Sequence, residues 1–397
     1  HHGDELSYAA KYGKNINAIV VPSTNANWRG EIRLGKGKAI LPKSGMVIKG
    51  QLDEISIDDW LSWQEKQSVN TDSSALAYID TISMNIGQLN AYQQQITGIA
   101  FTAERAAQDW RISLHSDQVK GNVNWPHKFD SATPIIMDFD HVYLQMPKTD
   151  TQVINAAQES SQKTDLWPSI NFHTQRLEVD DMKFGEINFL ATRHETSWDV
   201  DAAILKSASI NASIKGQWQQ LPTGEQSHFK LSAASDDFRS LLADLGYQQV
   251  MEADNVDIKM DLSWPNSPVD FSRSNIVGQL TMDVGKGRMI DVEPGAAGRI
   301  FGLLSVATIP RRLALDFTDL FGKGFSFDSI NGSFGLSNGT AYTDDLSMKG
   351  SSATIDVVGP VNLIEKTYDQ TIKITPNVAS TLPVAGAAVG GPIGLGV

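Results

Sequence analysis

The sequence predicts an all-β protein with mainly antiparallel strands, arranged as an extended array rather than as one closed globule. Three observations lead to this fold class: apolar and polar residues alternate in many short segments, glycine or asparagine follows these segments, and one unit of sequence occurs twice. Few segments have the apolar spacing that predicts a helix.

Alternation is clearest between residues 256 and 264. Every second residue there is apolar, namely Val256, Ile258, Met260, Leu262 and Trp264, and the residues between them are polar or charged. This pattern is typical of an antiparallel strand with one apolar and one solvated face. Shorter stretches repeat it, at Ile112/Leu114, Met137/Phe139, Ile210/Ala212/Ile214, Phe325/Phe327, Leu346/Met348 and Ile355/Val357.

Short sequences that contain glycine or asparagine predict the turns between these strands. They are Gly35-Lys36-Gly37, Gly285-Lys286-Gly287, Asn331-Gly332 and Asn338-Gly339. Asn-Gly is favoured in two-residue hairpin loops because both positions need a positive φ.

The repeated unit consists of residues 99–110 and 187–198, which have equal lengths and share Ile, Phe, Ala, Arg and Trp in register. Each copy is followed by an alternating strand and then by a Lys-Gly pair, Lys120-Gly121 in one case and Lys215-Gly216 in the other. A repeated unit in a strand-rich chain predicts an extended stack of neighbouring units.

Three segments predict helices. Residues 235–246 carry apolar residues at helical spacing, with Ser235 as the expected N-cap and Gly246 as the stop. A second helix is predicted from Ser56 to about Gln67, and a third, apolar around most of its circumference, over residues 294–309. The polar residues 70–75 and 150–163 predict long loops.

Composition narrows the class of partner. Lys and Arg total 33 against 46 Asp and Glu, so the formal net charge is −13, which argues against nucleic acid as a partner. The chain has no cysteine, which excludes thiol catalysis, disulfides and Cys-based metal sites. It has no run of about 20 apolar residues, so no helix is predicted to span a bilayer.

Candidate catalytic and metal-binding groups are few. Acidic pairs occur at residues 58–59, 180–181, 236–237 and 344–345, but adjacent residues of a strand point to opposite faces, and such pairs are typical of turns and caps. The best candidates for a pair of metal ligands are His115 with Asp117, and Asp140 with His141. Polar residues on the solvated face of a strand would give the same pattern without a metal. We therefore predict no enzyme activity, metal or cofactor.

Five segments carry a resemblance to a known family. They are PGAAGRIFGLLSVATIPRRLALDFTDLFGKGFSFD (residues 294–328), SDDFRSLLADLGY (235–247), DLSWPNSPVDF (261–271), TDDLSMKGSSATIDVVG (343–359) and TYDQTIKITP (367–376). Together they closely resemble the C-terminal part of YhdP-type proteins, large AsmA-like proteins of the Gram-negative envelope. The resemblance is most specific from about residue 229 onward.

This resemblance implies a U-shaped sheet whose apolar face lines a groove. It implies non-enzymatic transport of phospholipid between the inner and outer membranes, with the lipid tails in the groove, in support of the outer-membrane permeability barrier. The residues expected to line the groove are Val256, Ile258, Met260, Leu262, Phe325, Phe327, Phe334, Leu346, Met348, Ile355 and Val357. One alternative is that this face is the core of a sandwich in a non-catalytic envelope scaffold. A polysaccharide-acting β-repeat enzyme is the third reading.

The segment that begins at residue 294 is expected to touch a membrane or to close one end of the groove. The residues that would do so are Ile300, Phe301, Leu303, Leu304, Arg311 and Arg312. The basic residues at its end could approach anionic head groups. The alternative is an ordinary buried helix.

We expect one continuous β-groove over residues 1–397. Within it, residues 1–165 and 166–290 would carry the repeats, and residues 291–397 the C-terminal signature with its helices. The resemblance implies the periplasm of a Gram-negative bacterium, and an inner-membrane anchor in a missing segment N-terminal to this one. Residues 379–397 are uncharged and stop without a terminating feature, which also indicates a piece of a longer protein.

Overall fold

The computed structural model describes residues 7–22, 28–56, 78–91, 94–128, 133–146, 166–290, 326–351 and 353–377. In these residues the chain forms one sheet of 21 strands and a second sheet of 3 strands. The helical elements described are α3 (Phe238–Asp244) and the 3-10 helix η2 (Pro268–Asp270). The prediction of an all-β, mainly antiparallel fold is confirmed.

The large sheet contains almost every described strand. Its first half comprises β1 (Tyr8–Tyr12), β2 (Ile16–Val21), β3 (Arg29–Leu34), β4 (Met46–Ser56), β5 (Ile79–Ala91), β6 (Gln94–Arg105), β7 (Asp109–His115), β8 (Val119–Pro126), β9 (Ile135–Leu144) and β10 (Ile170–Val179). Its second half comprises β11 (Met182–Arg193), β12 (Ser197–Lys206), β13 (Asn211–Leu221), β14 (Gly224–Ser235), β16 (Val256–Pro265), β17 (Val277–Val284), β20 (Ser329–Ser337), β21 (Thr340–Lys349), β22 (Ala353–Asn362), β23 (Thr367–Tyr368) and β24 (Thr371–Pro376).

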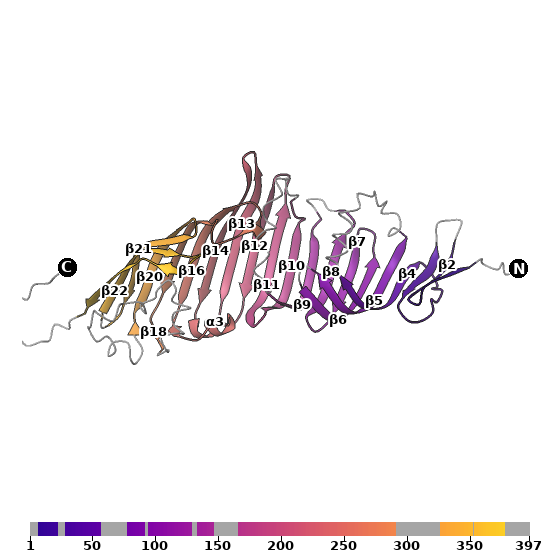
Figure 1. Ribbon diagram of the computed structural model, residues 1–397, viewed down its shortest axis with the longest axis horizontal. Helices are drawn as coiled ribbons and strands as arrows, with labels where there is room; N and C mark the ends of the chain where they lie inside the picture. Colours follow the sequence, from indigo (N-terminus) through magenta and orange to yellow (C-terminus); the bar gives the residue numbers. More distant parts are fainter. Residues whose placement is uncertain are drawn as a thin grey trace, which may run out of the picture.

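These strands lie side by side in the order of the sequence. Figure 1 shows them across the long axis of a curved, elongated sheet, with β2 toward one end and β22 toward the other. Among the described residues β1 pairs only with β2, and β24 only with β22, so the sheet is open rather than closed on itself. The small sheet of β15 (Met251–Ala253), β18 (Gly287–Met289) and β19 (Ser326–Phe327) lies near the C-terminal end.

Among the strand pairs in the described residues, three are parallel and the others are antiparallel. The parallel pairs are β3–β4, β4–β5 and β9–β10. The chain between the strands of each pair comprises residues 35–45, 57–78 and 145–169. Parallel neighbours need long connections because the chain must return to the edge from which it started. The segments predicted as polar loops, residues 70–75 and 150–163, fall within two of these connections and outside the described residues.

One face of the large sheet is apolar across many strands, and we call it the apolar face. A single row across it, aligned by strand register, consists of Ile214, Leu231, Met260, Leu280 and Phe334. A second row consists of Val256, Val284, Ile330, Met348, Ile355 and Ile374. The alternation seen in the sequence therefore produces a continuous hydrophobic surface, because the register of the antiparallel strands aligns the apolar positions.

Buried residues on this face form three clusters along the sheet. One centres on Met84, Ile99 and Phe139, the next on Trp198 and Trp218. The third lies toward the C-terminal end and includes Phe327 of the small sheet and Leu242 of α3. The small sheet and α3 therefore cover part of the apolar face at this end.

The opposite face is polar and carries cross-strand pairs. Examples are Lys120 Nζ to Asp140 Oδ2 at 2.7 Å, His173 Nδ1 to Asp138 Oδ1 at 2.7 Å, and His228 Nε2 to Asp261 Oδ1 at 2.6 Å. Pairs this exposed contribute little to stability, but they favour the observed register over like-charge alignments.

The predicted turns have mixed outcomes. Asn338-Gly339 forms the β20–β21 hairpin turn with φ values of 48° and 74°, as predicted. The turn predicted at Asn331-Gly332 is wrong, since both residues lie within β20, where a Cβ on Gly332 would be 2.8 Å from Leu346 Cδ1. That glycine permits close packing against β21. Gly35-Lys36-Gly37 follows β3, and Gly285-Lys286-Gly287 leads from β17 into β18, so neither closes a hairpin.

The predicted helices also differ in outcome. The helix predicted over 235–246 is present as α3, but its N-cap is Asp237, which accepts the Ser240 N–H, and not Ser235. Gly246 does end it: the N–H groups of Gly246 and Tyr247 bond to the carbonyls of Ala243 and Leu242, which is a Schellman motif. The helices predicted near residues 56–67 and over 294–309 lie outside the described residues, except that Ser56 is the last residue of β4.

Candidate functional site

An open apolar groove of about 750 Å³ runs over the apolar face of β11, β12, β13, β14 and β16. Its floor comes from alternate residues of these strands, among them Ile187, Ala203, Ile214, Leu231 and Met260. These side chains are half-buried, in contrast to the buried C-terminal cluster. A half-buried apolar surface that follows five adjacent strands is suited to a hydrophobic ligand.

Aromatic side chains line the edge of the groove at the end of the strands remote from α3. Trp198, Trp218 and Trp264 lie at one level, since Trp198 pairs with Trp218, and Ser227 of β14 lies between Trp218 and Trp264. Trp167 packs edge-on against Trp198 and Trp218, with ring centroids 5.0 and 5.5 Å away. Trp167, Trp198 and Trp264 border the groove, and the fully buried Trp218 packs against Trp167.

Each of the three buried indoles is fixed by a hydrogen bond at the rim. Trp198 Nε1 donates to the Pro168 carbonyl at 2.9 Å, Trp218 Nε1 to Glu225 Oε2 at 3.1 Å, and Trp264 Nε1 to the Ser267 carbonyl at 3.0 Å. Indole rings suit a boundary between an apolar interior and a wet edge, because one N–H is satisfied outside while the ring faces inward.

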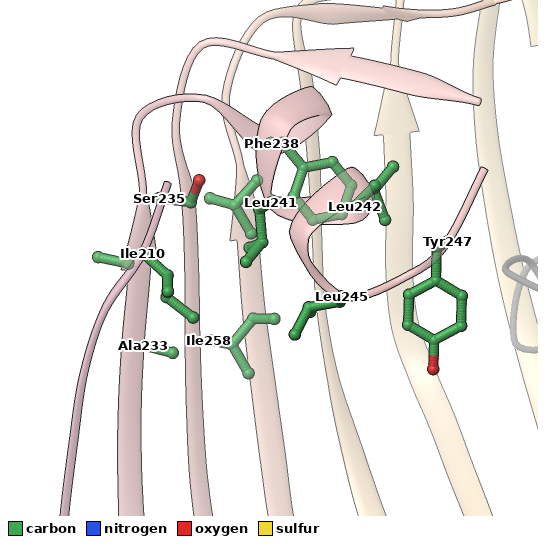
Figure 2. A pocket seen from close by; sticks show the side chains of 11 residues that line it. Ile210, Ala233, Ser235, Phe238, Leu241, Leu242, Leu245, Tyr247 and Ile258 are labelled. Carbon is green, nitrogen blue, oxygen red and sulfur yellow. The ribbon is translucent and has the colours of Figure 1, made fainter. Parts of the chain in front are cut away.

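At the other edge, α3 lies over the apolar face. Leu245, at the end of this helix, borders the groove together with Ile210 and Ala233. The same three residues border a second, smaller pocket beneath the helix. Figure 2 shows the side chains of Leu241 and Leu245 directed toward Ile210, Ala233 and Ile258 of the strands.

The residues predicted to line a groove fall into two groups. Met260 and Leu262 border the groove, and Val256 and Ile258 border the pocket beneath α3. The remainder of the described set lies in the buried C-terminal cluster, namely Phe327, Phe334, Leu346, Met348, Ile355 and Val357. Phe325 and the groove-end residues Ile300, Phe301, Leu303, Leu304, Arg311 and Arg312 lie outside the described residues.

Sequence reasoning did not select most of the groove. The lining residues on β11 and β12, such as Phe189 and Val200, come from the second copy of the internal repeat and the strand after it. The repeat predicts strands and, by itself, no ligand. The alternation at Ile210, Ala212 and Ile214 likewise predicts a strand, and all three residues border the groove. The second copy of the repeat is the feature of the sequence that coincides with the groove.

Perturbed carboxyl groups lie away from the groove floor. A hydrogen bond from His228, and a second from Lys230, lower the pKa of Asp261 on the polar face. A hydrogen bond from Lys120 lowers the pKa of Asp140, so the nearest metal-like pair in the sequence is an ion pair with lysine. The described residues contain no group of three or more His, Asp or Glu side chains placed to hold a metal ion.

No helix in the described part of the chain is both long enough and apolar enough to cross a membrane. The groove is a hydrophobic binding surface with tryptophan side chains at one edge and a short helix at the other. Its described lining includes one cationic side chain, Lys183 at the start of β11.

Comparisons with known proteins agree with the resemblance seen in the sequence. A family model described as YhdP protein matches residues 2–397. The intermembrane phospholipid transporter YhdP of Escherichia coli (strain K12) is 21% identical over 412 aligned residues, which cover 98% of this chain and 32% of the relative. The chain thus spans about a third of the length of this relative.

Proposed function

Because the chain belongs to the YhdP protein family, we propose that its groove carries phospholipid between the inner and outer membranes of a Gram-negative bacterium. The observation that supports this most is the half-buried apolar groove over β11–β16, within an apolar face that continues along the sheet. In this proposal the chain is one stretch of a longer conduit in the periplasm. A segment N-terminal to this chain would hold the conduit at the inner membrane.

The energetic reason for a conduit is the cost of exposing lipid tails to water. Each CH₂ group that leaves an apolar environment for water costs about 0.8 kcal/mol, so two sixteen-carbon tails would cost roughly 20–25 kcal/mol. A barrier of this height makes unassisted transfer very slow. An apolar groove removes most of it while the head group stays in solvent. Such transport needs no catalytic residue or cofactor, and we propose none.

The open sheet supports this use of the apolar face over the scaffold alternative. In a sandwich a second sheet covers the first, and the covered side chains are buried along the whole face. Here most of the described lining of β11–β16 is half-buried, and it bounds an open groove. The polysaccharide alternative would need two carboxylates converging on the bound sugar, whereas the described lining of the groove contains no Asp or Glu.

We propose that the C-terminal segment containing Phe301, Leu304, Arg311 and Arg312 meets a membrane or closes the groove. Its composition supports this role, since an apolar stretch is followed by paired arginines in a chain of net charge −13. Anionic lipid head groups are the expected contact of these arginines.

The direct test of the function is whether the purified chain retains lipid. Organic extraction followed by mass spectrometry should recover diacyl phospholipid in a substantial ratio to protein. Transfer of a fluorescent phospholipid between donor and acceptor vesicles should also be faster in the presence of the chain than in buffer without protein. Folded protein without bound lipid and without an effect on transfer would contradict the proposal.

A further inference from the structure

The pocket beneath α3 has a volume of about 300 Å³ and lies next to the groove. Its walls are almost entirely apolar: Phe238, Leu241, Leu242 and Leu245 from the helix side, with Ile210, Ala233, Val256 and Ile258 from the strands. Tyr247, just after the helix, stands at its side (Figure 2). Small side chains on β14, Ala233 and Ala234, leave the space open where larger apolar residues would fill it.

The pocket adjoins the groove. Ile210, Ala233 and Leu245 border both cavities, so only these side chains need to move aside for one apolar ligand to occupy the two. Along β16 the groove residues are Met260 and Leu262, and the pocket residues Ile258 and Val256 follow on the same face. Since a strand advances about 3.4 Å per residue, the pocket extends the apolar path along β16 by roughly 14 Å beyond Met260.

The helix that covers the pocket is held in place by polar contacts around it. Asp237 caps its first turn through Ser240, and Asp244 in its last turn accepts a hydrogen bond from Ser209 at 2.6 Å. Arg239 on its outer side pairs with Glu252 of β15, which also pairs with Arg288 of β18. A seven-residue helix is not stable alone, so these contacts and its leucines fix it over the strands.

We propose that the pocket beneath α3 is a binding subsite for the terminal part of a phospholipid acyl chain whose remainder lies in the groove. This inference rests on the proposed lipid-carrying function and adds a defined place and direction for one tail. An unfilled apolar cavity of this size lowers the stability of a protein, because its lining loses dispersion contacts. An acyl chain end restores them. The fixed helix then acts as the end wall of the binding site and limits how far a tail can reach.

Photo-crosslinking can locate the end of the tail. The chain is loaded from vesicles of phosphatidylethanolamine that contain either of two probes, one with a diazirine at the terminal acyl carbon and one with a diazirine on the head group. After irradiation, adducts are mapped by proteolysis and mass spectrometry. We expect the terminal-carbon probe to label residues 238–247 and the facing parts of β14 and β16. The head-group probe should leave residues 238–247 unlabelled.

Variants test whether the pocket itself captures the tail. Ala233→Phe fills the pocket from the strand side and should abolish labelling of residues 238–247, while labelling around Met260 and Leu262 persists. Ser232→Phe is the matched control, because Ser232 is the adjacent, exposed residue on the polar face of β14. If Ala233→Phe does not fold, Leu245→Ala replaces it. Widening the junction in this way should increase labelling beneath α3.

The outcomes separate this inference from the function on which it rests. If the terminal-carbon probe labels the groove strands but never α3, lipid binds in the groove and the subsite is wrong. Labelling of α3 by the head-group probe would reverse the direction of the lipid and overturn the proposal as well. If neither probe labels the groove or the pocket, the lipid-carrying function itself fails.

Discussion

The ring of Phe229 occupies the space that a side chain at Gly216 would need: a Cβ on that glycine would lie 2.6 Å from Phe229 Cδ1. The two residues are direct partners in the register of β13 and β14. Gly121 and Phe139, partners in β8 and β9, repeat this arrangement with a distance of 2.5 Å. Both glycines belong to the Lys-Gly pairs that follow the two copies of the repeated unit. The same glycine–phenylalanine contact therefore occurs after each copy, in addition to the same strand pattern.

Substitution of Gly216 should therefore destabilise the sheet. Gly216→Ala forces a Cβ toward the Phe229 ring and the His228 carbonyl oxygen, and we expect a loss of about 1–3 kcal/mol, as for overpacked cores. In a Phe229→Ala background the same substitution should cost less, because the ring has gone while the carbonyl remains. Thermal unfolding and hydrogen exchange of β13 and β14 measure both effects. Gly335→Ala is the control, since open space surrounds that position. Strictly additive effects of Gly216→Ala and Phe229→Ala on stability would refute the coupling between the two residues.

One substitution at two places should distinguish groove from core. Met260 borders the groove and is half-buried, whereas Met348 is 6% exposed within the C-terminal cluster. We expect Met260→Asp to leave the fold intact but to reduce bound phospholipid, because a charge in the groove repels the tails. Met348→Asp should cost several kcal/mol of stability, since it buries an unpaired charge. Circular dichroism melts and lipid mass spectrometry report the two effects, and equal loss of stability in both variants would show that Met260 is also core.

The N-cap of α3 should make the stability of this helix sensitive to acid. Hydrogen bonds from the Ser240 hydroxyl and backbone N–H lower the pKa of Asp237. A carboxyl group whose pKa is lower in the folded state stabilises that state above its unfolded pKa of about 3.9, and this contribution is lost as the pH falls through the folded value. Asp237→Ala should cost about 1 kcal/mol in the local stability of α3 at neutral pH. Asp237→Asn keeps the cap and should remove the acid sensitivity.

Hydrogen exchange of residues 238–245 at several pH values measures this effect. Protection in the wild type should fall in the acid range, whereas protection in Asp237→Asn should stay constant there. An identical acid profile for the two proteins would assign the change to another group.

Membrane contact by the C-terminal segment gives a binding prediction. Sixteen residues of helix, as predicted for 294–309, would measure about 24 Å, less than the roughly 30 Å hydrocarbon core of a bilayer, so this segment is expected to lie at a surface or over the groove. Phe301→Ser and Leu304→Ser, together with Arg311→Glu and Arg312→Glu, should weaken binding to anionic liposomes and leave bound lipid unchanged. Co-sedimentation measures this. Absence of binding by the wild type, with slow hydrogen exchange in this segment, would identify an ordinary core helix.

Much of the fold could be predicted because it depends on residues that are close together in the sequence. The alternation of Val256, Ile258, Met260, Leu262 and Trp264 predicts one face of a strand, and the structure places all five on the apolar face of β16. The stop at Gly246 and the hairpin at Asn338-Gly339 are likewise determined within a few residues, since each needs a positive φ.

The features that could not be predicted depend on distant residues. Whether Asn331-Gly332 forms a turn or continues a strand is decided by Leu346, which packs over Gly332 from the next strand. The parallel pairing of β9 with β10 depends on the path of the intervening chain, which alternation does not encode. The sequence also does not show which part of an apolar face is covered. Phe334 and Leu280 are register partners, yet Phe334 is buried and Leu280 is half-buried. Residues of α3 and of the small sheet, which come from elsewhere in the chain, belong to the same buried cluster as Phe334.

The sequential order of the strands makes the length of the molecule an adjustable property. In the described part of the large sheet each strand before β22 pairs only with the strands before and after it in that sheet, so a hairpin can be added or removed without rethreading any other part. Every added strand lengthens the sheet by about 4.8 Å, and 21 strands amount to roughly 100 Å along its path. Duplication of a unit such as the one repeated at residues 99–110 and 187–198 would therefore lengthen the sheet without changing the pairing of the strands on either side.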